Sequence, residues 1–183
     1  MSLSWSQIFR LGLVQMALGS IVVLTTSTLN RLMVVEFSLP ALLPGALVGL
    51  HYGIQLSRPR WGFRSDVGGN RTRWIIGGMI TLALGGVGAT YAVTLFAVHY
   101  WLALTASILS YGMIGIGVGA SGTSLLALLA TATAADRRAA AATITWLMMI
   151  FGIALTAGVS GQFLDPYSPQ RLMTVVSVIA LLA

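Results

Sequence analysis

The sequence contains neither cysteine nor lysine, and acidic residues are scarce, with four among 183 residues. Without cysteine there is no disulfide framework, no thiolate nucleophile and no cysteine-ligated metal site. Four acids and two histidines leave few side chains for hydrolytic or metal-dependent chemistry, and their spacing forms no acid–base dyad, catalytic triad or ligand cluster. We therefore predict that the chain is not an enzyme.

Apolar residues, by contrast, make up 57% of the chain, charged residues only 8%, and the mean hydropathy is +0.90. This composition lies far from that of a soluble domain. Residues 1–9 lack the basic region, apolar core and cleavage site of a signal peptide, so we expect the first helix to stay in place. The predicted fold class is an all-α, polytopic membrane protein.

Six apolar runs predict transmembrane helices in one bundle over residues 1–183, because about 20 residues at 1.5 Å each cross a hydrocarbon core of ~30 Å. Their approximate bounds are residues 10–35, 40–57, 74–93, 101–130, 139–164 and 171–183. The last run has too few residues to span a bilayer. We therefore expect the chain to be part of a longer protein.

Half of the ten arginines lie in residues 58–73, where Asp66 is the only acid. One arginine at the bilayer centre costs about 2.5–3.5 kcal/mol, so we predict that this segment is a loop outside the membrane. Arg31 and Arg171 fall near one side of the predicted bundle and the other eight arginines on the opposite side. The positive-inside rule then places the N-terminus and the arginine-rich loop in the cytoplasm. Arginines clustered in loops, rather than along one exposed face, argue against a nucleic-acid partner.

The first predicted helix carries an unusual number of polar side chains. Gln15, Gly19, Thr26 and Asn30 recur at helical spacing, with Arg31 in a second seam beside them. Polar side chains avoid lipid, so we expect both seams to face other helices or a cavity, and Asn30 and Arg31 become candidate ligand-binding residues. For Arg31 two alternatives stand: its side chain extends to the headgroups, or it pairs with Glu36 or with an acidic group of a ligand.

Glycines crowd the third and fourth predicted helices. Residues 117–122 match the pattern GxGxxG, but they lie inside a long apolar run with no preceding strand, so we do not expect a dinucleotide site. Small residues let membrane helices approach closely, and this is the role we predict for these glycines.

The arginine-rich segment resembles the signature between helices two and three of the major facilitator superfamily. The residues that carry the resemblance are Gly62, Asp66, Gly68, Arg71 and Arg73. Val67 replaces the arginine that usually follows the aspartate, and one extra residue separates the later basic pair. The resemblance implies the N-terminal half of a twelve-helix fold. Within it we expect Asp66 to be a structural latch that pairs with a neighbouring arginine, Arg71, Arg73 or Arg137.

A more specific resemblance covers residues 10–19, 28–36, 40–52 and 61–66, which look like the PucC and LhaA family. It implies a protein of the photosynthetic membrane of a purple bacterium that assists assembly of light-harvesting complexes and handles bacteriochlorophyll or antenna polypeptides. Carotenoid and lipid are further possible ligands, and membrane lipids and an antenna or reaction-centre complex are the expected partners. Two alternatives remain open: a structural subunit resident in such a complex, and half of a secondary transporter.

If pigment is handled, His51 is the best candidate for an axial ligand to a chlorophyll magnesium, because histidines inside membranes are functional by default. Gln55, one turn on, would hydrogen-bond a ring carbonyl or the other imidazole nitrogen. Glycines at steps of four, Gly45, Gly49 and Gly53, would offer a flat recess for the macrocycle. The alternative for His51 is an interhelical hydrogen bond worth about 1 kcal/mol.

Overall fold

The computed structural model describes residues 2–183, which form helices and no strand. Four helical stretches are long and apolar enough to cross a membrane: residues 5–35, 71–95, 100–132 and 135–163. The predicted all-α class is thereby confirmed, with four rather than six helices that meet the length and composition of a membrane span.

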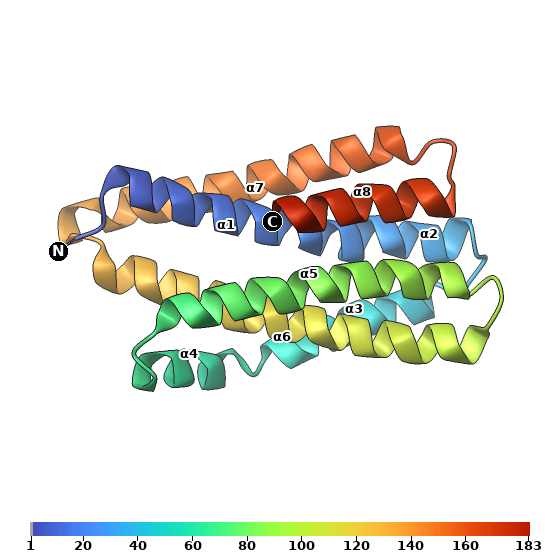
Figure 1. Ribbon diagram of the computed structural model, residues 1–183, viewed down its shortest axis with the longest axis horizontal. Coiled ribbons are helices and arrows are strands. Elements are labelled where there is room, and N and C mark those ends of the chain that lie inside the picture. The colour runs from blue at the N-terminus through green and yellow to red at the C-terminus, as the bar shows by residue number, and fades with distance from the viewer. Residues whose placement is uncertain (1) are drawn as a thin grey trace.

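The elements follow one another with short links (Figure 1). They are α1 (Trp5–Val23), a π-helical turn (Leu24–Thr28), α2 (Leu29–Val35), α3 (Leu42–Gln55), α4 (Arg58–Val67), α5 (Arg71–Leu95), α6 (Tyr100–Ala132), a 3₁₀ turn (Ala135–Arg137), α7 (Arg138–Phe163) and α8 (Pro169–Leu182). The first helix begins five residues earlier than predicted, because Ser4 and Gln7 form a reciprocal capping box at its N-terminus.

The arginine-rich segment is mostly helical, which corrects the predicted loop. Residues 58–67 form α4, with Pro59 in its first turn, where proline costs no hydrogen bond. Exclusion from hydrocarbon requires only that the segment lie outside the membrane core, and a short polar helix satisfies that requirement as well as a loop does. The second predicted span is also shorter than expected, because α3 covers 14 residues, or about 21 Å at 1.5 Å per residue.

The links divide between two ends of the bundle. Figure 1 shows the N-terminus, α4 and the α6–α7 link at one end, and the α2–α3, α5–α6 and α7–α8 links at the other. The first end is held together by contacts between distant segments: the Leu3 N–H donates to the Ala132 carbonyl at 2.8 Å, and the Arg137 guanidinium lies over the Trp5 ring at 5.6 Å. The structure therefore gathers the arginine-rich segments at one end, hereafter the arginine-rich end.

Glycine contacts set the spacing of the α5–α6 pair. A Cβ placed on Gly78 would lie 2.5 Å from the Ser121 amide nitrogen, and one on Gly117 would lie 2.6 Å from the Leu82 amide nitrogen. Real Cβ atoms do not approach backbone so closely, so only glycine fits at both positions. Gly117 belongs to the GxGxxG match, and its contacts are those of helix packing, as predicted.

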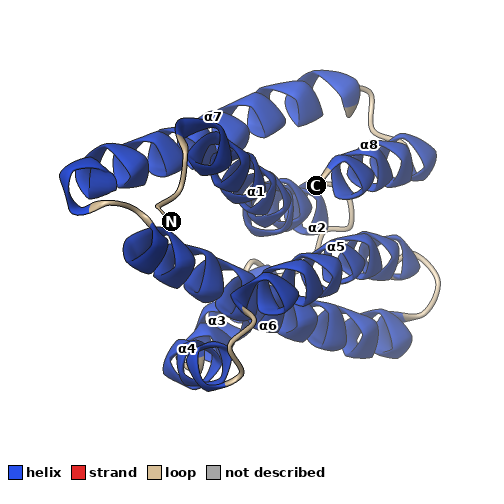
Figure 2. Ribbon diagram, turned by 60° about the vertical axis from the view of Figure 1, so that its left-hand side comes forward, coloured by secondary structure: helices blue, strands red, loops and turns tan. Residues whose placement is uncertain are grey.

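A second close pair joins α1 to α7. A Cβ on Gly152 would lie 2.5 Å from the Met16 carbonyl oxygen, and the Ser20 hydroxyl donates to the Gly152 carbonyl at 3.3 Å. Gln15 donates to the Met149 sulfur at 3.4 Å. The N-terminal half of the predicted polar seam therefore faces another helix, as expected. Figure 2 shows α7 beside α1 and apart from the group formed by α3, α4, α5 and α6.

The π-helical turn is a feature that the sequence pattern did not predict. The Thr25 hydroxyl donates to the Val22 carbonyl at 2.9 Å, and the Thr26 hydroxyl donates to the same carbonyl at 2.8 Å. Hydroxyl bonds of this kind compete with the helical ladder and accompany π-type distortions. The Thr25 carbonyl in turn accepts from the fully buried Tyr111 hydroxyl of α6 at 2.8 Å. The turn therefore joins the first helix to α6 through a hydrogen bond inside the bundle.

Candidate functional site

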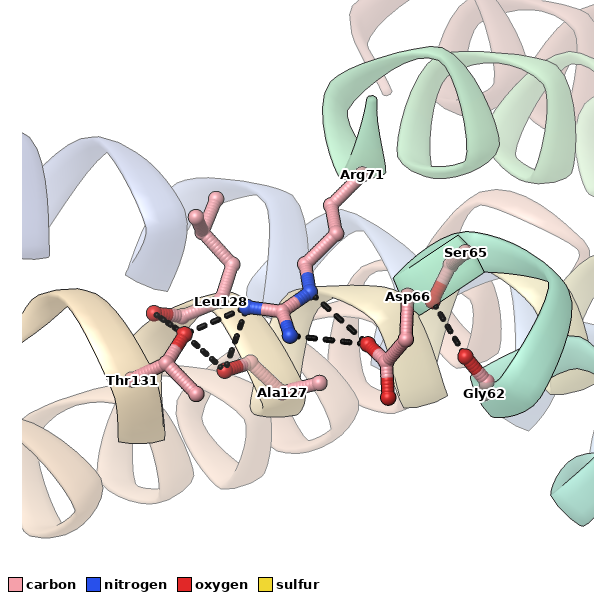
Figure 3. Close-up of polar contacts among 7 residues, drawn as sticks. All are labelled: Gly62, Ser65, Asp66, Arg71, Ala127, Leu128 and Thr131. Carbon is pink, nitrogen blue, oxygen red and sulfur yellow. Dashed lines mark hydrogen bonds and ion pairs between the residues drawn. The ribbon is translucent and has the colours of Figure 1, made fainter. Parts of the chain in front are cut away.

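The arginine-rich end contains a polar network centred on Arg71 (Figure 3). Arg71 donates to one Asp66 carboxylate oxygen through Nη2 at 2.7 Å and through Nε at 3.1 Å. Its Nη1 donates to the Thr131 hydroxyl and, at 3.4 Å, to the Ala127 carbonyl of α6. One guanidinium therefore ties the end of α4 to the start of α5 and to the last turns of α6.

The backbone around this network positions the two charges. Gly69 has φ +63°, which glycine adopts without strain, and the tight link it forms carries the chain from α4 into α5. On α4, the Ser65 hydroxyl donates to the Gly62 carbonyl at 2.9 Å. A Cβ on Gly62 would lie 3.3 Å from the Thr123 methyl, so this glycine brings α4 close to α6.

Among the predicted motif residues, Asp66 and Arg71 are brought together, whereas Arg73 is not. Asp66–Arg71 is the one ion pair found within residues 2–183. Within the same residues the Arg73 side chain forms no hydrogen bond or ion pair, although its backbone N–H is capped by Asn70. The two arginines of the motif therefore have different surroundings.

His51 is a residue of α3 whose side chain is fully buried, and its backbone carbonyl lies close to Gly115 of α6. The amide nitrogen of Gln55 lies 2.8 Å from the His51 Nε2, and the Gln55 carbonyl oxygen accepts from the Arg58 guanidinium. Because that oxygen faces a donor, the Gln55 amide donates to Nε2, and the neutral imidazole carries its proton on Nδ1. Nδ1 has no hydrogen-bond partner in the described part of the chain. The result is a polar chain that runs from Arg58 into the bundle.

This arrangement does not fit an axial ligand of chlorophyll. The nitrogen that projects from the ring, Nε2, is engaged by Gln55, and a fully buried ring leaves no space beside it for a macrocycle. The glycines expected to form the recess, Gly45, Gly49 and Gly53, have open space around them and lie on the opposite face of α3. Axial ligation by His51 therefore stays a prediction that this geometry argues against.

The C-terminal half of the polar seam of the first helix reaches the other end of the bundle. Asn30 is half-buried, while Arg31 is exposed and makes no ion pair with Glu36. The structure therefore shows no pairing of Arg31 with Glu36, and its extension to the headgroups and its pairing with an acidic group of a ligand both stay predictions. Glu36 instead lies near Tyr167 of the α7–α8 link, where burial and this carboxylate raise the pKa of the Tyr167 hydroxyl.

Comparison with known proteins places the chain in a family. The family model described as PUCC protein matches residues 28–183. The chain belongs to this family. It is 66% identical over 181 residues to the "Bacteriochlorophyll synthase 44.5 kDa chain" of Rhodobacter capsulatus, covering 99% of this chain and 42% of that protein. It is 30% identical to "Protein PucC" of R. capsulatus over 193 residues, 96% of this chain and 41% of that protein.

A third relative, "Protein PucC" of Cereibacter sphaeroides, is 30% identical over 188 residues, 95% of this chain and 40% of that protein. The chain therefore spans about two fifths of the length of these curated relatives. No solved structure matches it significantly. Family membership and the apolar helices together establish a multi-pass membrane protein of the PUCC family, which confirms the resemblance to PucC in the sequence.

Sequence reasoning did not find the α6 side of the Arg71 network. Thr131 and Ala127 lie about 60 positions from Arg71 in an apolar, alanine-rich run that gives no local signal of an arginine contact. The contact of Gln55 with Arg58 lies only three positions apart, but it crosses the boundary predicted between a membrane helix and a loop.

Replacement of Arg71 by glutamine is expected to destabilise the protein more than replacement of Asp66 by asparagine. Asp66 is half exposed, so loss of its charge removes an ion pair worth about 0.2–1 kcal/mol. Arg71→Gln also removes the donors to Thr131 and Ala127, for a total of roughly 1–2 kcal/mol. Thermal unfolding in detergent measures both, with Arg73→Gln as the charge-matched control that should leave stability unchanged. Equal losses in all three variants would contradict the latch.

Replacement of His51 by leucine is expected to leave the pigment content of the purified protein unchanged, because Nε2 is occupied by Gln55. Stability should change by no more than about 1 kcal/mol, the usual scale for one polar contact inside a membrane bundle. An absorption spectrum and a melting curve on the same sample measure both quantities. His99→Leu, at the exposed start of α6, is the control. Loss of a bacteriochlorophyll band in the His51 variant alone, with the fold intact, would restore the ligand role.

Proposed function

We propose that this protein assists the assembly of light-harvesting antenna complexes in a bacterial photosynthetic membrane, by handling bacteriochlorophyll or antenna polypeptides. Membership of the PUCC family over residues 28–183 is the observation that carries the proposal. The name of the 66% identical relative connects that protein with bacteriochlorophyll, and we extend the connection to this chain.

The surface of the bundle supports partners that lie within the membrane. Helix α7 and the turn before it are largely exposed: only 17% of the residues in their most apolar stretch are buried. Trp146, Ile150 and Phe151 are half exposed along this helix, most of whose contacts are with α1. Such a surface suits contact with lipid, pigment or the transmembrane helices of other proteins rather than capture of a soluble substrate.

We further propose that residues 1–183 form the six-helix N-terminal half of a fold like that of the major facilitator superfamily, in the intracytoplasmic membrane. The Asp66–Arg71 pair supports this proposal, since it occupies the position of the superfamily signature. The arginine-rich end then faces the cytoplasm by the positive-inside rule.

Three alternative functions are weaker. Proton-coupled transport by this half has no acid in the interior of a candidate span: Glu36, Asp66 and Asp165 lie in links or in α4, and Asp136 lies in the 3₁₀ turn that begins the 135–163 stretch. An enzyme, which the name of one relative suggests, would have few acid–base groups to use, since the chain carries four acids and two histidines, and within residues 2–183 these form no cluster able to hold a metal ion. A resident subunit of an antenna complex would use the same apolar surface of α7. The stoichiometry of this protein in the mature complex distinguishes a resident subunit from an assembly factor.

A deletion strain tests the function. We expect the antenna absorption bands to fall relative to the complemented strain, while pigment extracts show no build-up of bacteriochlorophyll precursors. The protein itself should be substoichiometric in purified mature antenna complexes. Accumulation of a precursor would instead make the protein a biosynthetic enzyme, and a fixed stoichiometry in the mature complex would make it a resident subunit.

Single cysteines test the orientation, because the natural sequence has none. Val67 is 71% exposed at the end of α4, and Gln170 is exposed at the opposite end of the bundle. With an impermeant thiol reagent, Val67→Cys should react in inverted vesicles and Gln170→Cys in intact spheroplasts. Ser65, in the same segment, is buried and unsuitable. Reaction of both variants in the same preparation would exclude the proposed topology.

A further inference from the structure

A groove opens at the arginine-rich end between α4, α5 and α6, with a volume of about 520 Å³. Figure 2 shows α4 beside α6, at the end of the bundle where α5 begins. The residues that define the groove are Arg73, Trp61, Trp74, Gly77, Ile116 and Ala120. None of these residues belongs to the Asp66–Arg71 network or to the His51 chain.

The outer part of the groove presents a cation and an indole donor. Arg73 is exposed, and its guanidinium has no partner within residues 2–183. The Trp61 indole N–H donates to the Ser57 hydroxyl at 2.9 Å, whereas the Trp74 indole N–H forms no hydrogen bond in the described residues. The two indole rings lie 5.8 Å apart. Tryptophan prefers the headgroup level of a membrane, so we expect this part of the groove at the interface.

The inner part of the groove is apolar and reaches along α5 toward the middle of the bundle. Thr81, its innermost lining residue on α5, is eight residues from Arg73, or about 12 Å of helix. A Cβ placed on Gly77 would meet nothing within 4 Å, whereas one on the adjacent Gly78 would collide with Ser121. Gly78 therefore serves helix packing, while Gly77 leaves open space in the floor of the groove.

We propose that this groove binds an anionic phospholipid from the leaflet at the arginine-rich end. The phosphate accepts hydrogen bonds from Arg73 and from the Trp74 indole, and one acyl chain lies over Gly77 against Ile116 and Ala120. A planar guanidinium suits phosphate because it donates two parallel hydrogen bonds. The five arginines of residues 58–73 face only one acid, so the surrounding field also favours a headgroup with a net negative charge. The site is independent of the proposed role in antenna assembly.

Native mass spectrometry of the intact protein tests the headgroup. Detergent-solubilised protein is mixed with phosphatidylglycerol or phosphatidylcholine of identical acyl chains, and the fraction with one lipid bound is measured. We expect preferential retention of phosphatidylglycerol. Arg73→Gln should lower the affinity for phosphatidylglycerol about fivefold, which is the effect expected of one arginine near an anionic lipid surface. Arg64→Gln removes the same charge from exposed α4 without lining the groove, so it weakens only the surrounding field and should lower the affinity clearly less than Arg73→Gln does.

Gly77→Leu tests the groove floor, because its Cβ would meet no protein atom within 4 Å and its side chain would extend into the space left for the acyl chain. We expect it to lower retention of phosphatidylglycerol while the melting temperature holds. Gly161→Leu, on α7, also enters open space and lies outside the groove, so it should retain lipid normally. Equal retention of the two lipids, equal losses for Arg73→Gln and Arg64→Gln, or normal retention by Gly77→Leu would each overturn the proposal.

Discussion

The contact between the α5 and α6 backbones at Gly78 and Gly117 is the constraint on which the rest of the arrangement depends. In a membrane, helices gain little from burying apolar side chains, so their association relies on close packing and hydrogen bonds. Because neither glycine can carry a Cβ, α5 and α6 lie at a fixed spacing along most of their lengths. That spacing brings Arg71, the first residue of α5, within reach of the last turns of α6.

The remaining helices join this pair through a few specific contacts. Tyr111 of α6 bonds the π-helical turn of the first helix, and the first helix holds α7 through the Gly152–Met16 contact. A Cβ on Gly115 would lie 2.8 Å from the carbonyl oxygen of His51, so α3 also packs closely on α6 because residue 115 is a glycine. Polar residues inside the bundle thus act mainly at helix contacts, and α7, whose contacts are mostly with α1, leaves a largely exposed apolar surface.

Features set by residues that are near one another in the sequence could be predicted, whereas features set by which helices meet could not. Apolar runs, arginine clusters and glycine-rich stretches are one-dimensional patterns, and they predicted the helical class, the gathering of arginines at one end and the close packing at Gly117. The pairing of Asp66 with an arginine was predicted from its position between arginines at a helix entrance, which left three arginines as candidates. The surroundings of His51 were not predictable, because they depend on which face of α3 meets α6. Helix α4 was missed because charge decides the location of a segment relative to the membrane but not its backbone conformation.

The carbonyl end of α6 explains why so many segments converge on the arginine-rich end. A helix of 33 residues ends in carbonyl groups that lack helical partners and carry the negative end of its dipole. Three donors meet the last turns of α6 or the residue that follows it: the Arg71 guanidinium at Ala127, the Leu3 amide at Ala132 and the Arg138 guanidinium at Thr133. The C-terminus of the longest described helix is therefore a point where the N-terminus, the start of α5 and the start of α7 meet, and the Leu3 amide supplies a donor to one of its terminal carbonyls.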